Sequence, residues 1–386
     1  MKYELMHKRL PTAVIELDEK RGFITKIHQI TTPEHLPVGV SYKKETTDRY
    51  SFNEWWTNRS IPLYRPGLLK MLSSFEIADP LQLLIRCNGL SLSDQYWIRP
   101  EGIDLSWDKI NYFDNPFSED VGNFLLGLSN CKDGMDFSSP DCTTNGNLEK
   151  AWKIIDGKRY LIKGGYQHEP FNEVIASRVM EQLKIPHIPY KMTEIDGIPY
   201  CLCEDFVNSQ TELIPAWMII QTKKRRRNET SSWQHFVDCC SELGISGTVE
   251  FLNKMIVLYC IIANEDRHYN NFGALRNAET LEWLGMAPIY DSGSSLGFDK
   301  DDWEILTGKF TFSKPFRKYH DEQLELVTDF SWIDFSHLSN ISEIIHETML
   351  PEIKTGKDFE RRIEMIRGSV QTRINYLTNV AENSFG

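Results

Sequence analysis

The chain has 386 residues, enough for one large two-lobed core or two modest domains. Its 43 basic and 55 acidic residues give a net charge of −12, which argues against nucleic acid as a direct ligand, because phosphate backbones need a basic surface. The eight cysteines include no Cys-x-x-Cys pair, so zinc-ribbon and thioredoxin-like sites are excluded. No apolar run has the roughly eighteen residues of a membrane span. Without a recognisable signal peptide, we expect a cytoplasmic protein with reduced thiols and no membrane partner.

The first third of the chain is predicted to form a small subdomain, residues 1–130. Alternating apolar residues predict a β-hairpin over residues 13–30, closed by a polar turn. Residues 52–85 have a helical pattern that prolines break into short pieces. Residues 91–124 are rich in aromatic side chains, which suit either a ligand platform or the core of a small domain. We favour the core.

A change in composition follows at residues 129–146, which are rich in Ser, Thr, Asn and Gly and are predicted to form a loop. Two strands come next, joined at Asp156-Gly157, a strong signal for a hairpin turn. A loop followed by a hairpin is how kinases cover the phosphates of ATP, although no Gly-x-Gly-x-x-Gly is present here.

Lys163 ends the second of these strands, and Pro170 opens a helix predicted over residues 171–184. Glu173 shares a helical stripe with small and apolar residues, so we expect its carboxylate to point inward. A strand lysine followed by a helix glutamate is the ion pair that holds ATP phosphates in kinases. A further strand pair over residues 190–203 leads into Glu204-Asp205-Phe206, where a kinase would place the hinge.

From residue 211 onward the pattern is mostly helical. An apolar run that ends at Ala263 is followed by the polar stretch Asn264-Glu265-Asp266-Arg267-His268-Tyr269-Asn270-Asn271, and Tyr290-Asp291 comes twenty residues later. Asp266 has the chemistry to accept a proton from an attacking hydroxyl, while Asn271 and Asp291 offer the oxygen ligands that magnesium prefers. A plain polar turn is the simpler alternative. A buried helix that ends in so many polar groups favours a site.

This order of motifs resembles the HipA-type serine/threonine kinases, bacterial toxins distantly related to the phosphatidylinositol 3/4-kinases. The resemblance covers roughly residues 140–300. It implies an α+β, two-lobed protein-kinase-like fold in which a small N-terminal subdomain precedes a β-rich N-lobe (131–207) and a mainly helical C-lobe (208–386). It also implies ATP and Mg²⁺ as cofactors. By position, the implied roles are general base for Asp266, phosphate-side residue for His268, magnesium ligands for Asn271 and Asp291, and nucleotide binding for Lys163, Glu173, Leu161, Glu204, Phe206, Tyr290, Asn145 and Gly146.

The resemblance further implies partners and regulation. The substrate would be a protein, by family analogy a translation factor or an aminoacyl-tRNA synthetase, and an antitoxin protein would be a second partner. HipA-type kinases phosphorylate a serine in the loop over ATP and so expel that loop. The corresponding candidates are Ser138, Ser139, Thr143 and Thr144. Two alternatives are a lipid kinase, for which the acidic chain supplies little membrane-facing basic surface, and an inactive kinase-fold binding module.

Overall fold

The computed structural model describes residues 1–43, 46–129, 134–226, 229–307, 311–353 and 357–384. The chain divides into two compact units, and each is described by itself. The first comprises Met1–Lys163, Glu204–Lys224 and Ala274–Leu284, and the second Gly164–Cys203, Arg225–Gly273 and Gly285–Gly386. Each unit therefore joins segments that lie far apart in sequence. The boundaries predicted at residues 130 and 207 stay predictions.

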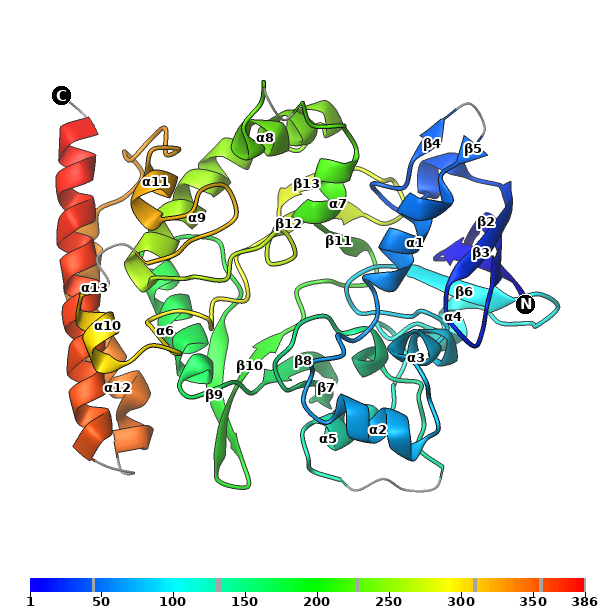
Figure 1. Cartoon of the computed structure of the whole chain (residues 1–386), viewed down its shortest axis with the longest axis horizontal. Coiled ribbons are helices and arrows are strands. Elements are labelled where there is room, and N and C mark those ends of the chain that lie inside the picture. The colour runs from blue at the N-terminus through cyan, green and yellow to red at the C-terminus, as the bar shows by residue number, and fades with distance from the viewer. Residues whose placement is uncertain (44–45, 130–133, 227–228, 308–310, 354–356, 385–386) are drawn as a thin grey trace. The chain divides into compact units, whose positions relative to one another are not determined.

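The first unit combines strands with short helices (Figure 1). Its strands are β1 (Lys2–His7), β2 (Leu10–Leu17), β3 (Ile24–Ile30), β4 (Tyr42–Lys43), β5 (Thr46–Thr47), β6 (Tyr96–Pro100), β7 (Lys150–Ile155), β8 (Lys158–Lys163) and β11 (Thr211–Pro215), with most of β12 (Gly273–Asn277) and part of β13 (Trp283–Met286). Its helices are α1 (Arg49–Thr57), α2 (Leu68–Ser74), α3 (Pro80–Arg86), α4 (Trp107–Ile110), α5 (Asp120–Leu125) and α7 (Ala216–Gln221), with 3₁₀ turns η1 (Pro33–His35) and η2 (Pro140–Thr143).

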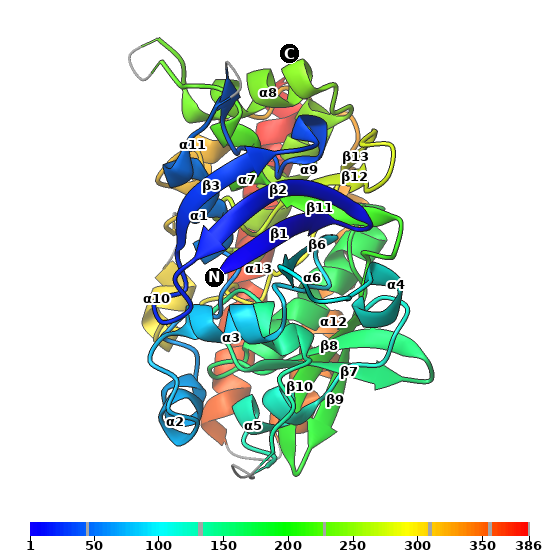
Figure 2. The same cartoon turned by 90° about the vertical axis from the view of Figure 1, so that its right-hand side faces the viewer.

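The N-terminal sheet is antiparallel, with strand order β3-β2-β1-β6, and Figure 2 shows β1, β2 and β3 side by side. Leu5 on β1 pairs with Ala13 on β2 and with Ile98 on β6, and all three side chains are buried. Burial alternates from Ala13 to Leu17 in β2, as the sequence pattern predicts, whereas consecutive residues are buried in β1 and β6. The predicted hairpin over residues 13–30 is confirmed, and β1 adds a strand that was not predicted.

The aromatic residues of the first unit form a core. Trp97, Trp107 and Trp152 belong to one buried cluster with Tyr112 and Phe113. Each of these five side chains is at most 9% exposed, so the cluster offers no open aromatic face to a ligand. The preference for a core over a ligand platform is confirmed.

One predicted element is wrong at its start. Residue 211 opens strand β11, not a helix, and the helix α7 begins only at Ala216. Burial alternates along β11, with Glu212 and Ile214 buried. Glu212 can be buried here because it forms an ion pair with Arg276 of β12, whose Nη2 lies 2.5 Å from the Glu212 carboxylate. The positive charge of Arg276 offsets the cost of burying the carboxylate. In the sequence, Glu212 has the character of a solvent-facing helix residue. The alternation of buried and exposed residues that marks a strand is therefore not visible there.

The second unit is mainly helical. Its strands are β9 (Tyr190–Ile195) and β10 (Ile198–Glu204), and its helices are α6 (Glu169–Gln182), α8 (Ser232–Leu243), α9 (Thr248–Ile262), α10 (Asp302–Thr307), α11 (His320–Leu324), α12 (Ile341–Ile353) and α13 (Lys357–Ser384), with 3₁₀ turn η3 (Phe335–Leu338). Helix α9 is buried along most of its length, and the long helix α13 packs on it and on α10 and α12 (Figure 1). The predicted α6 helix and β9–β10 hairpin are confirmed.

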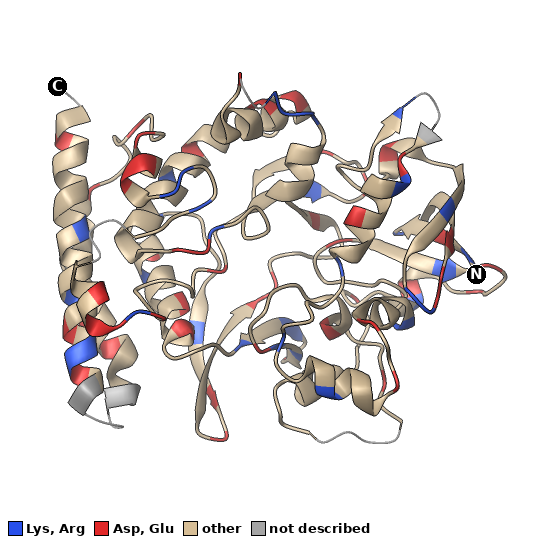
Figure 3. Ribbon diagram, in the orientation of Figure 1, with Lys and Arg blue, Asp and Glu red and all other residues tan. Residues whose placement is uncertain are grey.

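The basic run that begins at Lys223 is exposed over its described residues, 223–226. In Figure 3 the segment that joins α7 to α8 along the chain carries the blue of basic residues, and Arg226 pairs with Glu229. Exposed pairs of this kind contribute little stability, as is usual for a solvated loop. In the part of the chain that the structure describes, no helix is both long and apolar enough to cross a membrane.

Candidate active site

The candidate catalytic loop begins where α9 ends. Ala263 closes the helix with a left-handed φ of 50°, and the N–H of Asn264 returns to the carbonyl of Tyr259 at 3.0 Å. Asn264 is buried, and its Nδ2 donates to the hydroxyl of Ser295 at 3.0 Å. The loop is therefore fastened, at its first residue, to the segment that follows Asp291.

The buried guanidinium of Arg267 connects the two segments that carry the predicted metal ligands. Its Nη1 donates to the carbonyl of Asn271 and, at 2.8 Å, to that of Tyr290. Its Nη2 donates to the carbonyl of Asp291 at 2.9 Å, and the guanidinium lies 4.2 Å from the centre of the Tyr259 ring. Because a guanidinium presents its donors in a rigid planar fork, this one side chain fixes the three carbonyls relative to each other.

The predicted general base, Asp266, faces solvent, with its side chain 48% exposed. Its Oδ1 lies 2.8 Å from Nζ of Lys314, and its Oδ2 lies 3.8 Å from Nε2 of His268. Burial lowers the pKa of His268 below its ordinary value. The Asp266 carboxylate is thus accessible to an incoming hydroxyl, which is the first requirement of a general base.

The predicted magnesium ligands lie on the two segments that Arg267 joins. Nδ2 of Asn271 donates to the backbone carbonyl of Asp266 at 3.0 Å, so Oδ1 is the atom of the carboxamide left for a metal. Asp291 has a left-handed φ of 62° and supplies a carboxylate. Among the described residues, no group of three or more His, Cys, Asp or Glu is placed to hold a metal ion. One amide and one carboxylate fit Mg²⁺, which takes few protein oxygens, better than zinc, which takes three or four nitrogen or sulfur ligands.

Helix α6 holds the segment that follows the second metal-ligand candidate. Oε2 of Glu173 accepts the N–H of Ser292 at 2.8 Å, and Nδ2 of Asn172 donates to the carbonyls of Gly293 and Ser295 at 2.9 and 2.7 Å. Glu173 is only 2% exposed, so its predicted inward orientation is confirmed. Its pairing with Lys163 stays a prediction, since the two residues belong to different units.

In the first unit, the candidate nucleotide loop has more structure than was predicted. Ser139 caps the 3₁₀ turn η2, and Asp141 within it is fully buried and accepts the N–H of Trp152 at 3.0 Å. The carbonyls of Thr144 and Gly146 accept hydrogen bonds from Arg65. The loop expected over residues 129–146 is corrected at Pro140–Thr143, which form η2, while residues 130–133 lie outside the described residues. Tertiary burial, which a Ser- and Thr-rich composition does not indicate, is the reason.

The four candidate phosphorylation sites differ in exposure. Ser138 is exposed, Ser139 and Thr143 are buried, and Thr144 is half-buried. The Thr143 hydroxyl donates to the carbonyl of Leu90 at 2.8 Å. In this arrangement of the loop, a kinase therefore reaches Ser138 first.

The remaining predicted nucleotide residues lie on β8 and at the start of the hinge segment. Lys163 is buried, and Leu161 and Phe206 pack on the aromatic cluster. The Glu204 carboxylate forms an ion pair with the first lysine of β8, and the N–H of Asp205 donates to a β8 carbonyl at 2.8 Å. One backbone donor of the expected hinge is thus used within the chain, and the binding of adenine by this segment stays a prediction.

Tyr290, which was predicted to frame adenine, donates its hydroxyl to the carbonyl of Asn270 at 3.1 Å. This contact ties the tyrosine to the catalytic loop. Its role toward adenine stays a prediction.

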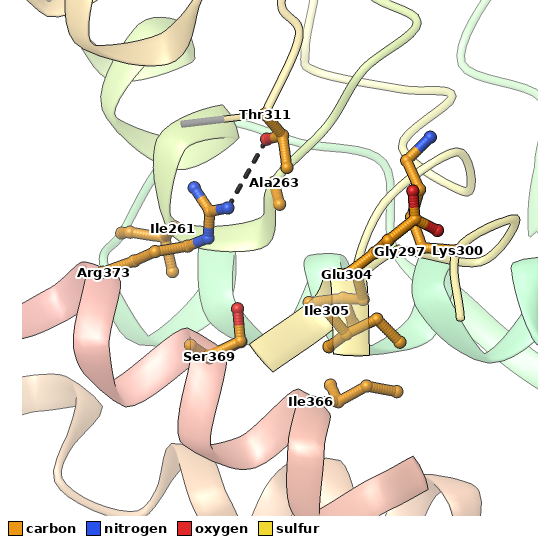
Figure 4. Close-up of a pocket in the computed structure, with 12 residues that line it drawn as sticks. Ile261, Ala263, Gly297, Lys300, Glu304, Ile305, Thr311, Ile366, Ser369 and Arg373 are labelled. Atoms are coloured by element: carbon orange, nitrogen blue, oxygen red, sulfur yellow. Dashed lines mark hydrogen bonds between the residues drawn. The ribbon is translucent and has the colours of Figure 1, made fainter. Parts of the chain in front are cut away.

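A small cavity in the second unit borders the start of the catalytic loop (Figure 4). Its volume is about 20 Å³, far below the roughly 300 Å³ at which pockets begin to hold small-molecule ligands. Arg373 of α13 lines it, and donates to Thr311 and to the carbonyl of Cys260, each at 3.4 Å. The cavity is therefore no nucleotide site, and Arg373 anchors the last turn of α9.

The comparisons with known proteins bear on the family and the fold of the chain. The profile of the HipA-like C-terminal domain matches residues 143–365, which is more than half of the chain. The chain belongs to the HipA-like family. No curated protein matches it.

Two solved structures are similar to this HipA-like protein. One is HipA of Shewanella oneidensis MR-1, from a toxin–antitoxin complex with HipB and operator DNA, with 12% identity, a TM-score of 0.57 and coverage of 98% of this chain and 99% of that chain. The other is the Helicobacter pylori proinflammatory kinase CtkA, with 18% identity, a TM-score of 0.49 and coverage of 61% of this chain and 94% of that chain. The likeness to HipA shows the fold alone. The predicted family and fold class are confirmed.

Sequence reasoning missed three side chains that the structure places at these segments, namely Arg65, Arg267 and Lys314. Arg267 left a signal, because an arginine directly after a buried helix and between two catalytic candidates is placed to organise both. No sequence signal identifies Lys314, since it contacts Asp266 across 48 residues of sequence. Arg65 left none either, because its acceptors are backbone carbonyls about eighty residues further along the chain.

Proposed function

We propose that this HipA-like protein is an ATP- and Mg²⁺-dependent serine/threonine protein kinase. The observation that carries the proposal is the set of bonds from Arg267 to the segments of Asn271 and Asp291, next to the exposed carboxylate of Asp266. A base and two oxygen ligands on one framework are the parts that phosphotransfer requires, because its catalysis consists of positioning and of stabilising charge.

In the proposed reaction, the oxygen of a serine or threonine hydroxyl bonds to the γ-phosphorus of ATP as the bond to the ADP oxygen breaks. The hydroxyl proton passes to the carboxylate of Asp266. Asn271 and Asp291 would hold magnesium, which when bound neutralises charge on the β- and γ-phosphates. Lys314, at 2.8 Å from the Asp266 carboxylate, supplies a positive charge where the γ-phosphate would develop negative charge, and His268 is a second phosphate-side residue.

Nucleotide binding is assigned to the residues that the family resemblance indicates. Lys163 and Glu173 would set the α- and β-phosphates, and both side chains are buried. The other nucleotide-binding residues of this proposal are Asn145, Gly146, Leu161, Glu204, Phe206 and Tyr290.

We also propose autophosphorylation within residues 138–144 and an antitoxin protein as partner. The first rests on the exposed hydroxyl of Ser138, beside the candidate nucleotide loop. The second rests on family membership and on the solved HipA, whose structure includes HipB and operator DNA. The substrate class that follows is a protein with an accessible serine or threonine.

The deciding experiment is incubation with labelled ATP and Mg²⁺ in a bacterial lysate, followed by mass spectrometry of the labelled proteins. Asp266→Asn is the matched control, because its side chain is isosteric and half exposed, so fold and ATP binding should persist while transfer falls by about 10²-fold or more. Transfer to lipid alone would support the lipid-kinase alternative. Wild-type transfer by Asp266→Asn, or no Mg²⁺-dependent transfer by the wild-type protein, would reject the proposal.

A further inference from the structure

The side chain of Arg65 is an unusual feature of the first unit. It lies between α1 and α2, outside the region matched by the family profile, and is only 2% exposed. Burial lowers its pKa to about 10, which leaves the guanidinium charged at neutral pH. A buried charge must make strong hydrogen bonds to be tolerated.

The bonds of Arg65 all go to the candidate nucleotide loop. Nη2 donates to the carbonyls of Thr144 and Gly146, each at 2.6 Å, and Nε donates to the Gly146 carbonyl at 3.0 Å. The carbonyl between them, that of Asn145, accepts from Nζ of Lys150 at 2.7 Å. Two cations therefore hold three consecutive carbonyls.

The direction of these carbonyls determines the direction of the loop amides. In a planar trans peptide, the N–H points opposite to the C=O of the preceding residue. The N–H groups of Asn145 and Asn147 therefore point away from Arg65, and the N–H of Gly146 points away from Lys150. Gly146 allows this course with a φ of +93°, and a Cβ at this position would lie 2.5 Å from Nζ of Lys150. The amides of Asn145 and Asn147 share one direction, because the carbonyls before them both bind Arg65, and backbone amides that point the same way can bind an anion.

One of these amides already donates a hydrogen bond to a side-chain oxygen. The N–H of Gly146 donates to Oδ1 of its neighbour Asn145 at 2.6 Å, and the Asn145 side chain is exposed. An exposed side-chain oxygen is easily displaced by a stronger acceptor, such as a phosphate.

We propose that Arg65 is the positioning residue of the nucleotide loop: it holds the carbonyls of Thr144 and Gly146 inward, so that the loop amides face the phosphates of ATP. This inference rests on the proposed function for its ligand. The hydrogen bonds by which Arg65 holds the loop do not depend on that function. It gives the N-terminal segment a part in nucleotide binding, through a side chain that never touches the nucleotide.

The test compares Arg65→Gln and Arg65→Lys with Arg59→Gln. Arg59 is a matched control, because it is also a buried arginine of the first unit that donates to backbone carbonyls, those of Gly89 and Tyr96, and none of its bonds reaches the loop. The readouts are the thermal midpoint, the KM for ATP against kcat, and hydrogen exchange of the amides of residues 144–147 without nucleotide.

For Arg65→Gln we expect faster exchange at these amides and a KM for ATP raised about tenfold or more, with kcat changed much less, since charged hydrogen bonds are among the strong ones. Arg65→Lys should recover part of both losses. Arg59→Gln should lower the thermal midpoint and leave KM and loop exchange unchanged. Wild-type exchange and KM in Arg65→Gln, or equal effects in Arg59→Gln, would overturn the proposal. If the wild-type protein transferred no phosphate, the proposed function would fail, and loop exchange would still decide whether Arg65 holds the loop.

Discussion

Replacing Arg267 by methionine is the substitution that most directly tests the framework of the site. Methionine keeps the length and loses every donor, so the carbonyls of Asn271, Tyr290 and Asp291 lose their partner together. A buried acceptor left without a partner costs about 1–3 kcal/mol. Relief from burying a charge offsets part of this. We therefore expect a net loss of about 3–5 kcal/mol, a large share of the roughly 5–15 kcal/mol that stabilises a domain.

Stability and metal binding should fall together in this variant. Urea unfolding gives the change in free energy, and calorimetric titration of ATP with and without Mg²⁺ gives the metal dependence of binding. Arg362→Met is the matched control, since Arg362 also donates to backbone carbonyls of the second unit, those of Gly297 and Phe298, away from the metal-ligand candidates. Arg267→Met protein that is folded at the assay temperature and keeps wild-type Mg²⁺ dependence would show that Arg267 does not organise the ligands.

Three further predictions concern single side chains. Lys314→Met should leave the thermal midpoint nearly unchanged, because Lys314 and Asp266 form a half-exposed pair. It should nevertheless lower kcat about tenfold or more. A wild-type kcat in steady-state kinetics would show that Lys314 forms a surface ion pair and takes no part in transfer. Burial raises the pKa of Asp141 to about 7 from its ordinary 3.8, so the stability this group contributes is present below about pH 4 and lost as the pH rises through 7. Asp141→Asn should therefore stabilise the protein more at pH 8 than at pH 5, by at most about 1.4 kcal/mol per unit of pKa difference. Thermal melts of the variant and the wild-type protein check this, and the same difference in thermal midpoint at both pH values would contradict it. Ser138→Ala should remove phosphate found by mass spectrometry in the active protein, whereas Ser139→Ala should not, because Ser139 is buried; phosphate on Ser138 of the Asp266→Asn form would argue against autophosphorylation.

The sequence by itself determined the local elements and the chemistry of the candidate site. The two-residue alternation that ends in Leu17 predicts a strand because successive side chains face opposite sides of a sheet. Asp156-Gly157 predicts the β7–β8 turn because its residues accept positive φ, as both do here. The order of Asp266, Asn271 and Asp291 predicts a phosphotransfer site because each role requires a particular functional group at a short range of spacings.

Only the tertiary structure decided which charges are buried and what they hold. Arg65 and Glu212 look like surface residues in the sequence, because a charged side chain is stable inside a protein only when distant segments supply its partners. Arg267 finds carbonyls some 23 residues away, and Arg65 finds them about eighty residues away. The same cause turned β11 into a strand and ordered residues 139–143. The sequence names the candidate groups for the chemistry, and long-range partners that leave no local pattern determine how those groups are held.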